Sequence, residues 1–329
     1  MPPAPAADRL RLPAMQAVTI SDGELLLAEH PDPEPGAGEV LVAVRGAGLN
    51  GADLLQLKGG YPAPPVSPAD IPGLELAGEV VGRGPGAERF AEGDRVMGIV
   101  GGGGQAELCV VHERQLMPVP ERLDWAHAGG VAEAFTTAHD ALFTQARLAM
   151  GEKVLVSGAA GGVGTAAVQL AAAAGARVVA SVRDGSLYDA VAGLGASAVC
   201  TPDESPELGP YDVILELVGA PDLEANLTAL ATGGRIAVIG VGAGFKAEVN
   251  LLRLMGARGS ICGSTLRARP LEEKAQTARA MERHVLPLFD EGRLEVPLQQ
   301  TFPLGQAPAA YELFALPGKF GKIVLEPGS

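Results

Sequence analysis

Cysteine is scarce in this chain, which has three among its 329 residues, at Cys109, Cys200 and Cys262. Their number is odd, they lie far apart in the sequence, and none has the CxxC spacing of a thiolate metal site. This argues against a disulfide framework and against a zinc cluster. We expect all three to be small, partly buried apolar side chains rather than a redox centre.

Positive charge is also scarce: 25 Lys and Arg residues stand against 39 Asp and Glu residues, so the net charge is −14. An acidic surface disfavours nucleic acid and anionic membranes as partners, although one anionic cofactor can still bind in a local site. The sequence also lacks an apolar run of membrane-spanning length, and we recognise no signal peptide. We therefore expect a cytoplasmic protein.

The two halves of the sequence have different secondary-structure patterns, and the length of the chain suggests two domains. Up to about residue 120, short apolar stretches alternate with Gly, Pro and Asp turns, which predicts an all-β half. From residue 153 onward, strand-like and helix-like segments alternate, which predicts a parallel doubly wound sheet with crossover helices. Residues 1–13, MPPAPAADRLRLP, are rich in Pro and Ala and are expected to be disordered.

The stretch from Gly151 to Gly175, GEKVLVSGAAGGVGTAAVQLAAAAG, reads as strand, glycine-rich turn and helix. Glycines let a backbone approach a ligand closely, and the amides at a helix start attract a pyrophosphate. The GxGxxG pattern is only partly met, because Ala159 takes the first glycine's place. The alternative is an ordinary turn in a chain rich in Ala and Gly. The expected pyrophosphate contacts are Ala160, Gly161, Gly162, Val163 and Gly164.

From Gly151 through Gln169, this stretch resembles the signature of the quinone oxidoreductase (zeta-crystallin-like) branch of the medium-chain dehydrogenases/reductases. It departs from that signature at Ala172, where Lys, Arg or Ser is usual. The resemblance extends from about Met15 to Leu325. It implies an α/β Rossmann doubly wound parallel sheet, over residues 132–266, and a GroES-like irregular β-barrel catalytic domain. The barrel domain would comprise residues 1–131, completed by residues 267–329.

The same resemblance implies that zinc is absent. The zinc enzymes of the superfamily have a Cys where this chain has Asn50 and a His where it has Leu74, and the Cys-rich lobe for structural zinc is also missing. Zinc needs three or four N, S or O donors brought together. Without a Lewis acid, hydride transfer to an already electrophilic quinone or enone is feasible, whereas oxidation of an unactivated alcohol is hard.

By resemblance, Asn50 and Tyr61 line the active cleft as catalytic residues, and Asn50 also serves the cofactor. The amide of Asn50 can bind a carboxamide or a substrate carbonyl, and the Tyr61 phenol can orient or protonate it. The alternative for Tyr61 is an aromatic residue that holds its loop. Thr137 matches the threonine near the nicotinamide, with a helix residue bonded to its own backbone as the alternative. Glu133 is interpreted as structural.

Cofactor choice depends on the end of the second Rossmann strand, where NAD enzymes usually place an acid. Val182 stands at that position, and Arg183 follows it, with Ser186 nearby to help bind a 2′-phosphate. Asp184 could instead serve NAD. We expect NADPH, with NADH possible, and a solvated Arg183 is the alternative.

Other residues are assigned to the cofactor by the same resemblance. Lys322 is expected to approach the cofactor phosphates, and Arg267 and Arg269 are interpreted as surface or subunit-contact residues. The remaining cofactor contacts that we predict are Val218, Gly219, Gly240 and Gly242.

The resemblance therefore predicts a zinc-independent NADPH-dependent reductase of a small-molecule quinone or enone. The alternatives are an enal or enoyl-thioester reductase of a biosynthetic pathway, and an NADPH-binding sensor without significant turnover. A homodimer is expected, joined through the edge strand in the segment GSICGSTL, residues 259–266.

Overall fold

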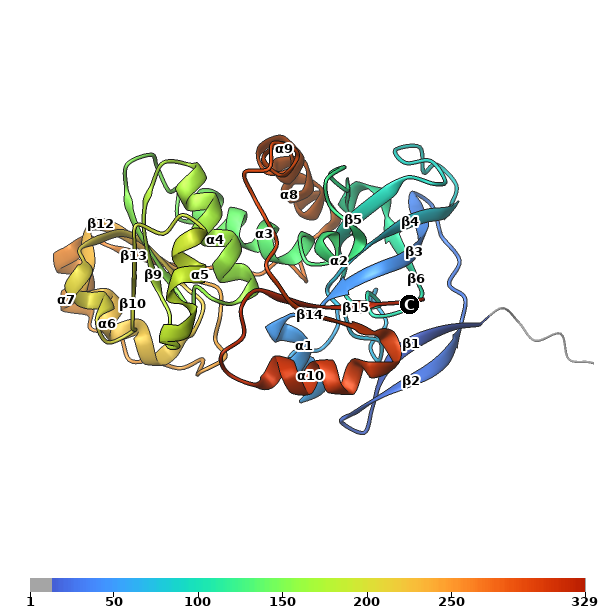
Figure 1. Ribbon diagram of the computed structural model, residues 1–329, viewed down its shortest axis with the longest axis horizontal. Coiled ribbons are helices and arrows are strands. Elements are labelled where there is room, and N and C mark those ends of the chain that lie inside the picture. The colour runs from blue at the N-terminus through green and yellow to red at the C-terminus, as the bar shows by residue number, and fades with distance from the viewer. Residues whose placement is uncertain (1–13, 329) are drawn as a thin grey trace, which may run out of the picture.

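The computed structural model describes residues 14–328, so the segment expected to be disordered lies outside the described residues. Within them, one half of the molecule is built on a seven-stranded sheet and the other on a six-stranded parallel sheet (Figure 1). The predicted fold class, a GroES-like β domain with a Rossmann domain, is confirmed. The exact boundaries at residues 131 and 267 stay a prediction.

The β half combines both ends of the chain. Strand β3 pairs with β4 and β6, and the C-terminal strand β15 pairs with β3, so the last segment returns to the first half. Apolar residues at every second position of β3 are buried in the core of this sheet. The strands are β1 (Ala14–Ser21), β2 (Glu24–Pro31), β3 (Glu39–Gly48), β4 (Glu75–Arg83), β5 (Arg95–Ile99), β6 (Leu108–His112), β7 (Leu116–Pro118), β14 (Leu298–Pro303) and β15 (Lys322–Glu326). Two helices belong with them, α1 (Gly51–Leu57) and α10 (Ala307–Ala315).

The Rossmann half has the strand order β10-β9-β8-β11-β12-β13. The order reverses between β8 and β11, and ligands of open parallel sheets bind at such a switch point, outside the carboxyl ends of the strands. Its strands are β8 (Lys153–Ser157), β9 (Arg177–Ser181), β10 (Ala198–Cys200), β11 (Tyr211–Glu216), β12 (Leu230–Val238) and β13 (Ser260–Gly263). Its helices are α4 (Gly162–Ala173), α5 (Tyr188–Gly193), α6 (Leu223–Thr228) and α7 (Leu251–Ala257).

The remaining helices lie at or near the junction of the two halves. They are α2 (Trp125–Ala128), α3 (Ala132–His139), α8 (Leu271–His284) and α9 (Leu286–Asp290). In Figure 1, α3 lies between the two halves, and α8 and α9 lie at the top of the view. Residues 125–149 divide at the pair Gly129 and Gly130 into α2 and α3, and α3 continues as a π-helical stretch, Asp140–Gln145. The 14-residue helix α8 ends at His284, and the short α9 follows it with a proline in its first turn.

Short helical turns complete the chain, at Glu113–Gln115, Gly185–Leu187, Ser205–Leu208, Ala220–Asp222 and Leu304–Gln306. The turn Ser205–Leu208 lies in the connection between β10 and β11. No helix among the described residues is long and apolar enough to cross a membrane.

The cysteines are unpaired, as the sequence predicts. Cys109 and Cys200 are buried, and Cys262 is partly buried. Burial raises the pKa of Cys109 to about 12 and that of Cys200 to about 11, so both thiols stay protonated at neutral pH. They act as small apolar side chains.

Candidate active site

The glycine-rich turn joins β8 to α4, where the sequence predicts it. A Cβ on Gly164 would lie 2.4 Å from the Gly158 carbonyl oxygen, so helix α4 can start this close to the strand only with glycine there. Gly161 has φ −75° and ψ 170°, and no side chain of the described residues caps the helix. The first amides of this 12-residue helix are therefore available to an anion, which fits a pyrophosphate.

The carboxyl ends of β11 and β12 lie beside this turn. Glu216, the last residue of β11, fixes the turn that follows this strand. Its Oε1 accepts hydrogen bonds of 2.6 Å from Val218 N and 2.7 Å from Gly219 N. A Cβ on Gly158 would lie 3.4 Å from Val218 Cγ2, so the two turns are in contact. Gly240 follows β12 and passes so close to the end of β11 that its Cβ would lie 2.1 Å from the Leu217 carbonyl oxygen.

Gly242 lies farther out, with nothing within 4 Å of the position of a Cβ. The predicted contacts Val218, Gly219 and Gly240 are thus brought together with the glycine-rich turn, and Gly242 borders open space. Their roles toward a cofactor stay predictions.

Charged and polar side chains follow the carboxyl end of β9. Arg183 is exposed. Asp184 is engaged by Ser186, whose amide and hydroxyl donate hydrogen bonds of 3.0 and 2.7 Å to Asp184 Oδ1. Lys319, from the loop before β15, donates a hydrogen bond of 2.8 Å to the Phe314 carbonyl oxygen. Burial lowers the pKa of Lys319, and the nearby charge of Arg183 lowers it further.

Lys319, from the segment before β15, therefore lies close enough to Arg183 for their two positive charges to interact. Sequence reasoning found Arg183 and missed Lys319, although Lys319 stands in the segment Gly-Lys-Phe-Gly-Lys that ends at the predicted Lys322.

Asn50 and Lys322 lie in a buried polar cluster. The Lys322 ammonium donates to Glu75 Oε1 at 2.6 Å, to the Leu49 carbonyl oxygen at 2.8 Å and to Asn50 Oδ1 at 2.9 Å. Asn50 Nδ2 donates to the same Glu75 oxygen at 3.0 Å. The cluster fixes the amide of Asn50 at the start of α1, where Asn50 N donates to Asp53 Oδ2 at 2.8 Å.

This geometry differs from the expectation for Lys322. Its three N–H groups are all engaged, so a contact between its ammonium and the cofactor phosphates would require the cluster to open. Its stem instead lies against the glycine-rich turn, where a Cβ on Gly162 would lie 2.5 Å from Lys322 Cδ. Lys322 thereby links Asn50 to the start of α4. Glu75, which the sequence analysis missed, accepts hydrogen bonds from both the Lys322 ammonium and the Asn50 amide.

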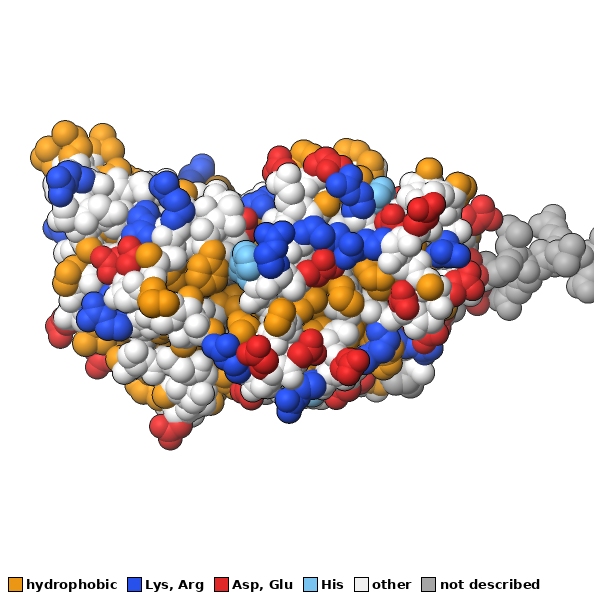
Figure 2. Space-filling model, turned by 90° about the horizontal axis from the view of Figure 1, so that it is seen from above, with side chains coloured by type: hydrophobic (Ala, Val, Ile, Leu, Met, Phe, Trp, Pro, Cys, Tyr) orange, Lys and Arg blue, Asp and Glu red, His pale blue; other side chains and the backbone are white. Residues whose placement is uncertain are grey.

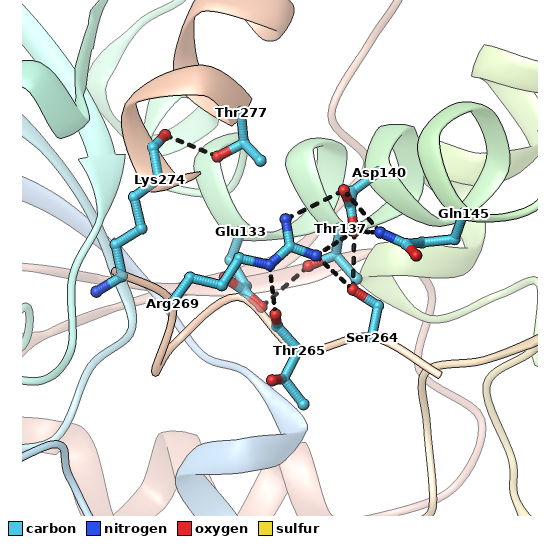
Figure 3. Close-up of polar contacts among 9 residues, drawn as sticks. All are labelled: Glu133, Thr137, Asp140, Gln145, Ser264, Thr265, Arg269, Lys274 and Thr277. Carbon is cyan, nitrogen blue, oxygen red and sulfur yellow. Dashed lines mark hydrogen bonds and ion pairs between the residues drawn. The ribbon is translucent and has the colours of Figure 1, made fainter. Parts of the chain in front are cut away.

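Thr137 and Glu133 are one helical turn apart on α3 and point toward each other (Figure 3). Thr137 Oγ1 donates a hydrogen bond of 3.0 Å to Glu133 Oε1, so its partner is a side chain rather than its own backbone. Glu133 N donates to Glu75 Oε2 at 2.7 Å, which joins α3 to the polar cluster. Burial raises the pKa of Glu133 to about 7, with the charge of Glu75 as the next cause.

Arg267 holds Tyr61 in place, and the interpretation of Arg267 as a surface or subunit-contact residue is wrong. Arg267 is 2% exposed. Its guanidinium donates to the Tyr61 carbonyl oxygen at 2.9 Å and to Gln56 Oε1 at 2.6 Å, and it lies 5.1 Å from the centre of the Tyr61 ring. Tyr61 itself is half-buried, and burial raises the pKa of its phenol. The ring is thus anchored, although this does not decide between its two predicted roles.

Arg269, interpreted in the same way, is partly exposed and is paired within its own chain. Its guanidinium lies 2.7 Å from Asp140 Oδ2, and Ser264 Oγ donates to that oxygen at 2.8 Å (Figure 3). This ion pair attaches the loop after β13 to α3. A polar cavity of about 630 Å³ lies beside it, between α3 and α8, and includes Thr136 in its lining.

The metal prediction can be compared with the side chains that are present. Over residues 14–328, no three His, Cys, Asp or Glu side chains gather as a metal site would require. Near Asn50, three oxygens surround the Lys322 ammonium and accept hydrogen bonds from it. They are Asn50 Oδ1, Glu75 Oε1 and the Leu49 carbonyl oxygen. Zinc independence stays a prediction.

Comparison with known proteins agrees with this architecture. Residues 36–121 match the family model of the alcohol dehydrogenase GroES-like domain, and residues 162–283 match that of the zinc-binding dehydrogenase. The crystal structure of an NAD-dependent alcohol dehydrogenase superposes with a TM-score of 0.84 at 30% identity, covering 95% of this chain and 100% of the other.

Two curated relatives of this chain differ in how much of their own length the match covers. The quinone oxidoreductase of Rattus norvegicus is 31% identical over 304 residues, which cover 89% of this chain and 90% of the relative. The spectinabilin polyketide synthase system protein NorB of Streptomyces orinoci is 36% identical over 338 residues, which cover 99% of this chain but 15% of the relative. The chain is an oxidoreductase that belongs to the medium-chain dehydrogenase/reductase superfamily, with the quinone oxidoreductases among its relatives.

Proposed function

We propose that this protein is a zinc-independent, NADPH-dependent reductase that acts on a small quinone or α,β-unsaturated carbonyl compound. The observation that carries the proposal is the cluster of Lys322, Glu75 and Asn50. Its oxygens are turned toward an ammonium, and this set of side chains supplies no thiolate or imidazole donors for a Lewis acid. A substrate that is already electrophilic fits such a site.

The residues around the switch point fit a dinucleotide in two ways. The uncapped start of α4 suits the pyrophosphate, and the pair of cations Arg183 and Lys319 suits a 2′-phosphate. Asp184 would compete for a ribose hydroxyl, but its Oδ1 already accepts two hydrogen bonds from Ser186. When bound, NADPH supplies the hydride. Thr137 and Gly240 would then border the nicotinamide.

The protein's own residues would bind and orient the substrate. Both N–H groups of the Asn50 amide are engaged, by Glu75 Oε1 at 3.0 Å and the Gly48 carbonyl oxygen at 3.1 Å, so the group that Asn50 can offer is the remaining acceptor site of Oδ1, which suits the N–H of a carboxamide. Tyr61, anchored by Arg267, would orient the substrate carbonyl. Tyr61→Phe should then lower turnover while cofactor affinity is kept, and unchanged turnover would leave Tyr61 the role of holding its loop.

A second candidate is an enoyl-thioester reductase of a biosynthetic pathway. The similarity to the Streptomyces orinoci polyketide synthase protein favours it, because the match extends over almost the whole of this chain. The hydride chemistry would be the same, and only the acceptor would differ.

We also propose that the protein is a homodimer that works in the cytoplasm. Strand β13 is the edge of the Rossmann sheet, and the neighbouring α7 presents exposed Leu251, Leu252 and Met255. Figure 2 shows hydrophobic side chains gathered at that end of the molecule, at the left of the view. An open edge strand beside an apolar surface suits pairing with a second copy. The unpaired cysteines suit a reducing compartment.

The deciding experiment is to follow oxidation of NADPH and of NADH by chelator-treated protein with a simple quinone, a simple enone and an enoyl thioester. Faster NADPH oxidation with the quinone or the enone is the expected result. Faster reduction of the thioester would favour the second candidate. Tight NADPH binding without turnover of any acceptor would overturn both and leave a cofactor-binding sensor.

A further inference from the structure

Glu133 has an unusual position for a residue that only supports the fold. It lies in the first turn of α3, and its Oε1 accepts the hydrogen bond from Thr137. Its Oε2 is out of contact with solvent and, among the described residues, has no hydrogen-bond partner. A buried carboxyl oxygen without a partner is costly for the folded protein. The cost would be removed by a ligand group that bonds to Oε2.

The charged groups around Glu133 come from several different elements. Glu75 on β4 and Asp53 on α1 disfavour a negative charge on Glu133, and Lys322 on β15 favours it. On the other side lie Lys274 on α8, Arg267 in the loop before α8, and Tyr61, each close enough to interact electrostatically with Glu133. Burial outweighs the cations, so the pKa rises to about 7 and the acid keeps its proton up to near-neutral pH.

The Thr137 hydroxyl also decides which oxygen of Glu133 carries that proton. Because it donates to Oε1, this oxygen acts as an acceptor, and the proton of the neutral acid is left on Oε2. The same hydroxyl belongs to the residue expected beside the nicotinamide. A proton is thus held within one hydrogen bond of the place where hydride would be delivered.

We propose that Glu133 is the general acid of the reduction, a role that rests on the proposed function. As hydride forms a new C–H bond on the electrophilic carbon, the π electrons move onto the substrate oxygen. The O–H bond of Glu133 then breaks, and a new O–H bond forms on that oxygen. The substrate would gain one hydride, which bound NADPH would supply with its two electrons, and one proton. Solvent reaches other atoms of the partly exposed Glu133, and the carboxylate would be reprotonated from that side once the product has left.

The test compares Glu133→Gln with Thr136→Val. Glutamine keeps the size of Glu133 and can accept from Thr137, but it has no acidic proton. The matched control removes a buried hydroxyl on the same helix that has no hydrogen-bond partner among the described residues. We expect Glu133→Gln to lower kcat about 100-fold, the lower end of the usual range for general acids, and Thr136→Val to leave it nearly unchanged.

The dependence on pH separates an acid from a structural residue. An acid must be protonated to act, so wild-type kcat/KM, which reports ionisations of the free enzyme, should fall as pH rises through about 7, and this fall should disappear in Glu133→Gln. The NADPH dissociation constant, measured by fluorescence titration, should be the same in both. A wild-type pH profile in Glu133→Gln, or an unchanged kcat, would overturn the proposal while leaving the reductase function in place.

A measurement that needs no substrate distinguishes failure of the Glu133 proposal from failure of the proposed reductase function. Infrared difference spectra of the protein, recorded across the same pH range, should contain the C=O band of one buried carboxylic acid that is missing in Glu133→Gln. If no band depends on Glu133, the acid is ionised and the proposal falls, whatever the activity. If the band is present but the wild-type protein reduces no acceptor, the proposed function falls, and the proton-donor role falls with it.

Discussion

At the scale of single residues, the site depends on which charges are paired. Glu75 bonds to Lys322, Asn50 and the amide of Glu133, so one carboxylate ties together β4, β15, α1 and α3. Arg183 and Lys319, by contrast, lie near each other as two cations. Their like charges repel, and a phosphate bound by both would remove that repulsion.

Arg183 and Lys319 can be tested one at a time. We expect Arg183→Ala and Lys319→Ala each to weaken NADPH binding about tenfold, the effect of losing one charge-assisted hydrogen bond, while NADH binding changes little. Arg177→Ala is the matched control, since Arg177 is exposed at the opposite end of the same strand. The measurement is fluorescence titration with both cofactors. Equal losses for NADPH and NADH would remove these residues from the 2′-phosphate site.

Asp53 provides a prediction about stability. It is buried, and burial raises its pKa from 3.8 to about 7. The folded state therefore holds a proton that the unfolded state releases above about pH 4, so this contribution is full below pH 3.8 and is lost as pH rises through 7. At pH 8, Asp53→Asn should be more stable than the wild type by roughly 2–4 kcal/mol, whereas at pH 4 the two should be similar.

The comparison between variant and wild type is needed because other groups titrate too. His139 has its pKa lowered to about 4 by burial and by His284, so its contribution rises with pH and opposes that of Asp53. The measurement is urea unfolding of both proteins at each pH. An equal difference in unfolding free energy at both pH values would show that the pKa of Asp53 is the same in the folded and unfolded states.

At the scale of elements, periodicity predicted most of the fold and little of the buried polar site. The alternation of Rossmann strands and helices, and the return of the C-terminal strand to the first half, are all found. Helix α7 was missed, because its Leu251, Leu252 and Met255 are mostly exposed and no buried stripe marks it.

The site residues that the sequence analysis missed have a common cause. Glu75 and Glu133 are 58 positions apart, and Arg267 lies 206 positions from Tyr61, so their contacts depend on how distant elements pack. A local pattern contains no such information. Motif residues such as Gly164 were found because their role depends on the turn in which they stand.

The glycine-rich turn allows a prediction that separates folding from binding. A Cβ on Gly161 would meet only the Gly158 carbonyl oxygen, at an ordinary 3.7 Å, and the extended backbone there suits alanine. Gly161→Ala should therefore keep the wild-type melting temperature but weaken NADPH binding about tenfold or more, because its methyl group would occupy the place of the pyrophosphate.

Gly164→Ala is the contrasting variant. Its Cβ would lie 2.4 Å from the backbone oxygen of Gly158, so it should lower the free energy of unfolding by about 1–3 kcal/mol. Thermal unfolding and NADPH titration of both variants check the pair. Wild-type affinity in Gly161→Ala would mean that the phosphates do not approach this turn.

At the scale of the whole molecule, the exposed end of the Rossmann half is the part least explained by a single chain. Strand β13 leaves one edge without a neighbouring strand among the described residues, and α7 beside it exposes three large apolar side chains. Exposed apolar patches of this kind mark interaction surfaces, and a two-fold axis would bring β13 beside its own copy.

The corresponding variant is Leu252→Glu with Met255→Glu, which places two charges on α7, where these side chains are 80% and 69% exposed. We expect the wild type to sediment as a dimer and the double variant as a monomer, since burying two unpaired carboxylates costs more than such a contact gains. Met150→Glu is the control: Met150 is 84% exposed but lies in the loop before β8. Helix α7 is far in sequence from the glycine-rich turn, and Met150 precedes β8, at the opposite end of that strand from the turn, so both variants should keep NADPH affinity. A wild-type monomer at all concentrations, or a double variant that stays dimeric, would show that a second copy does not cover this surface.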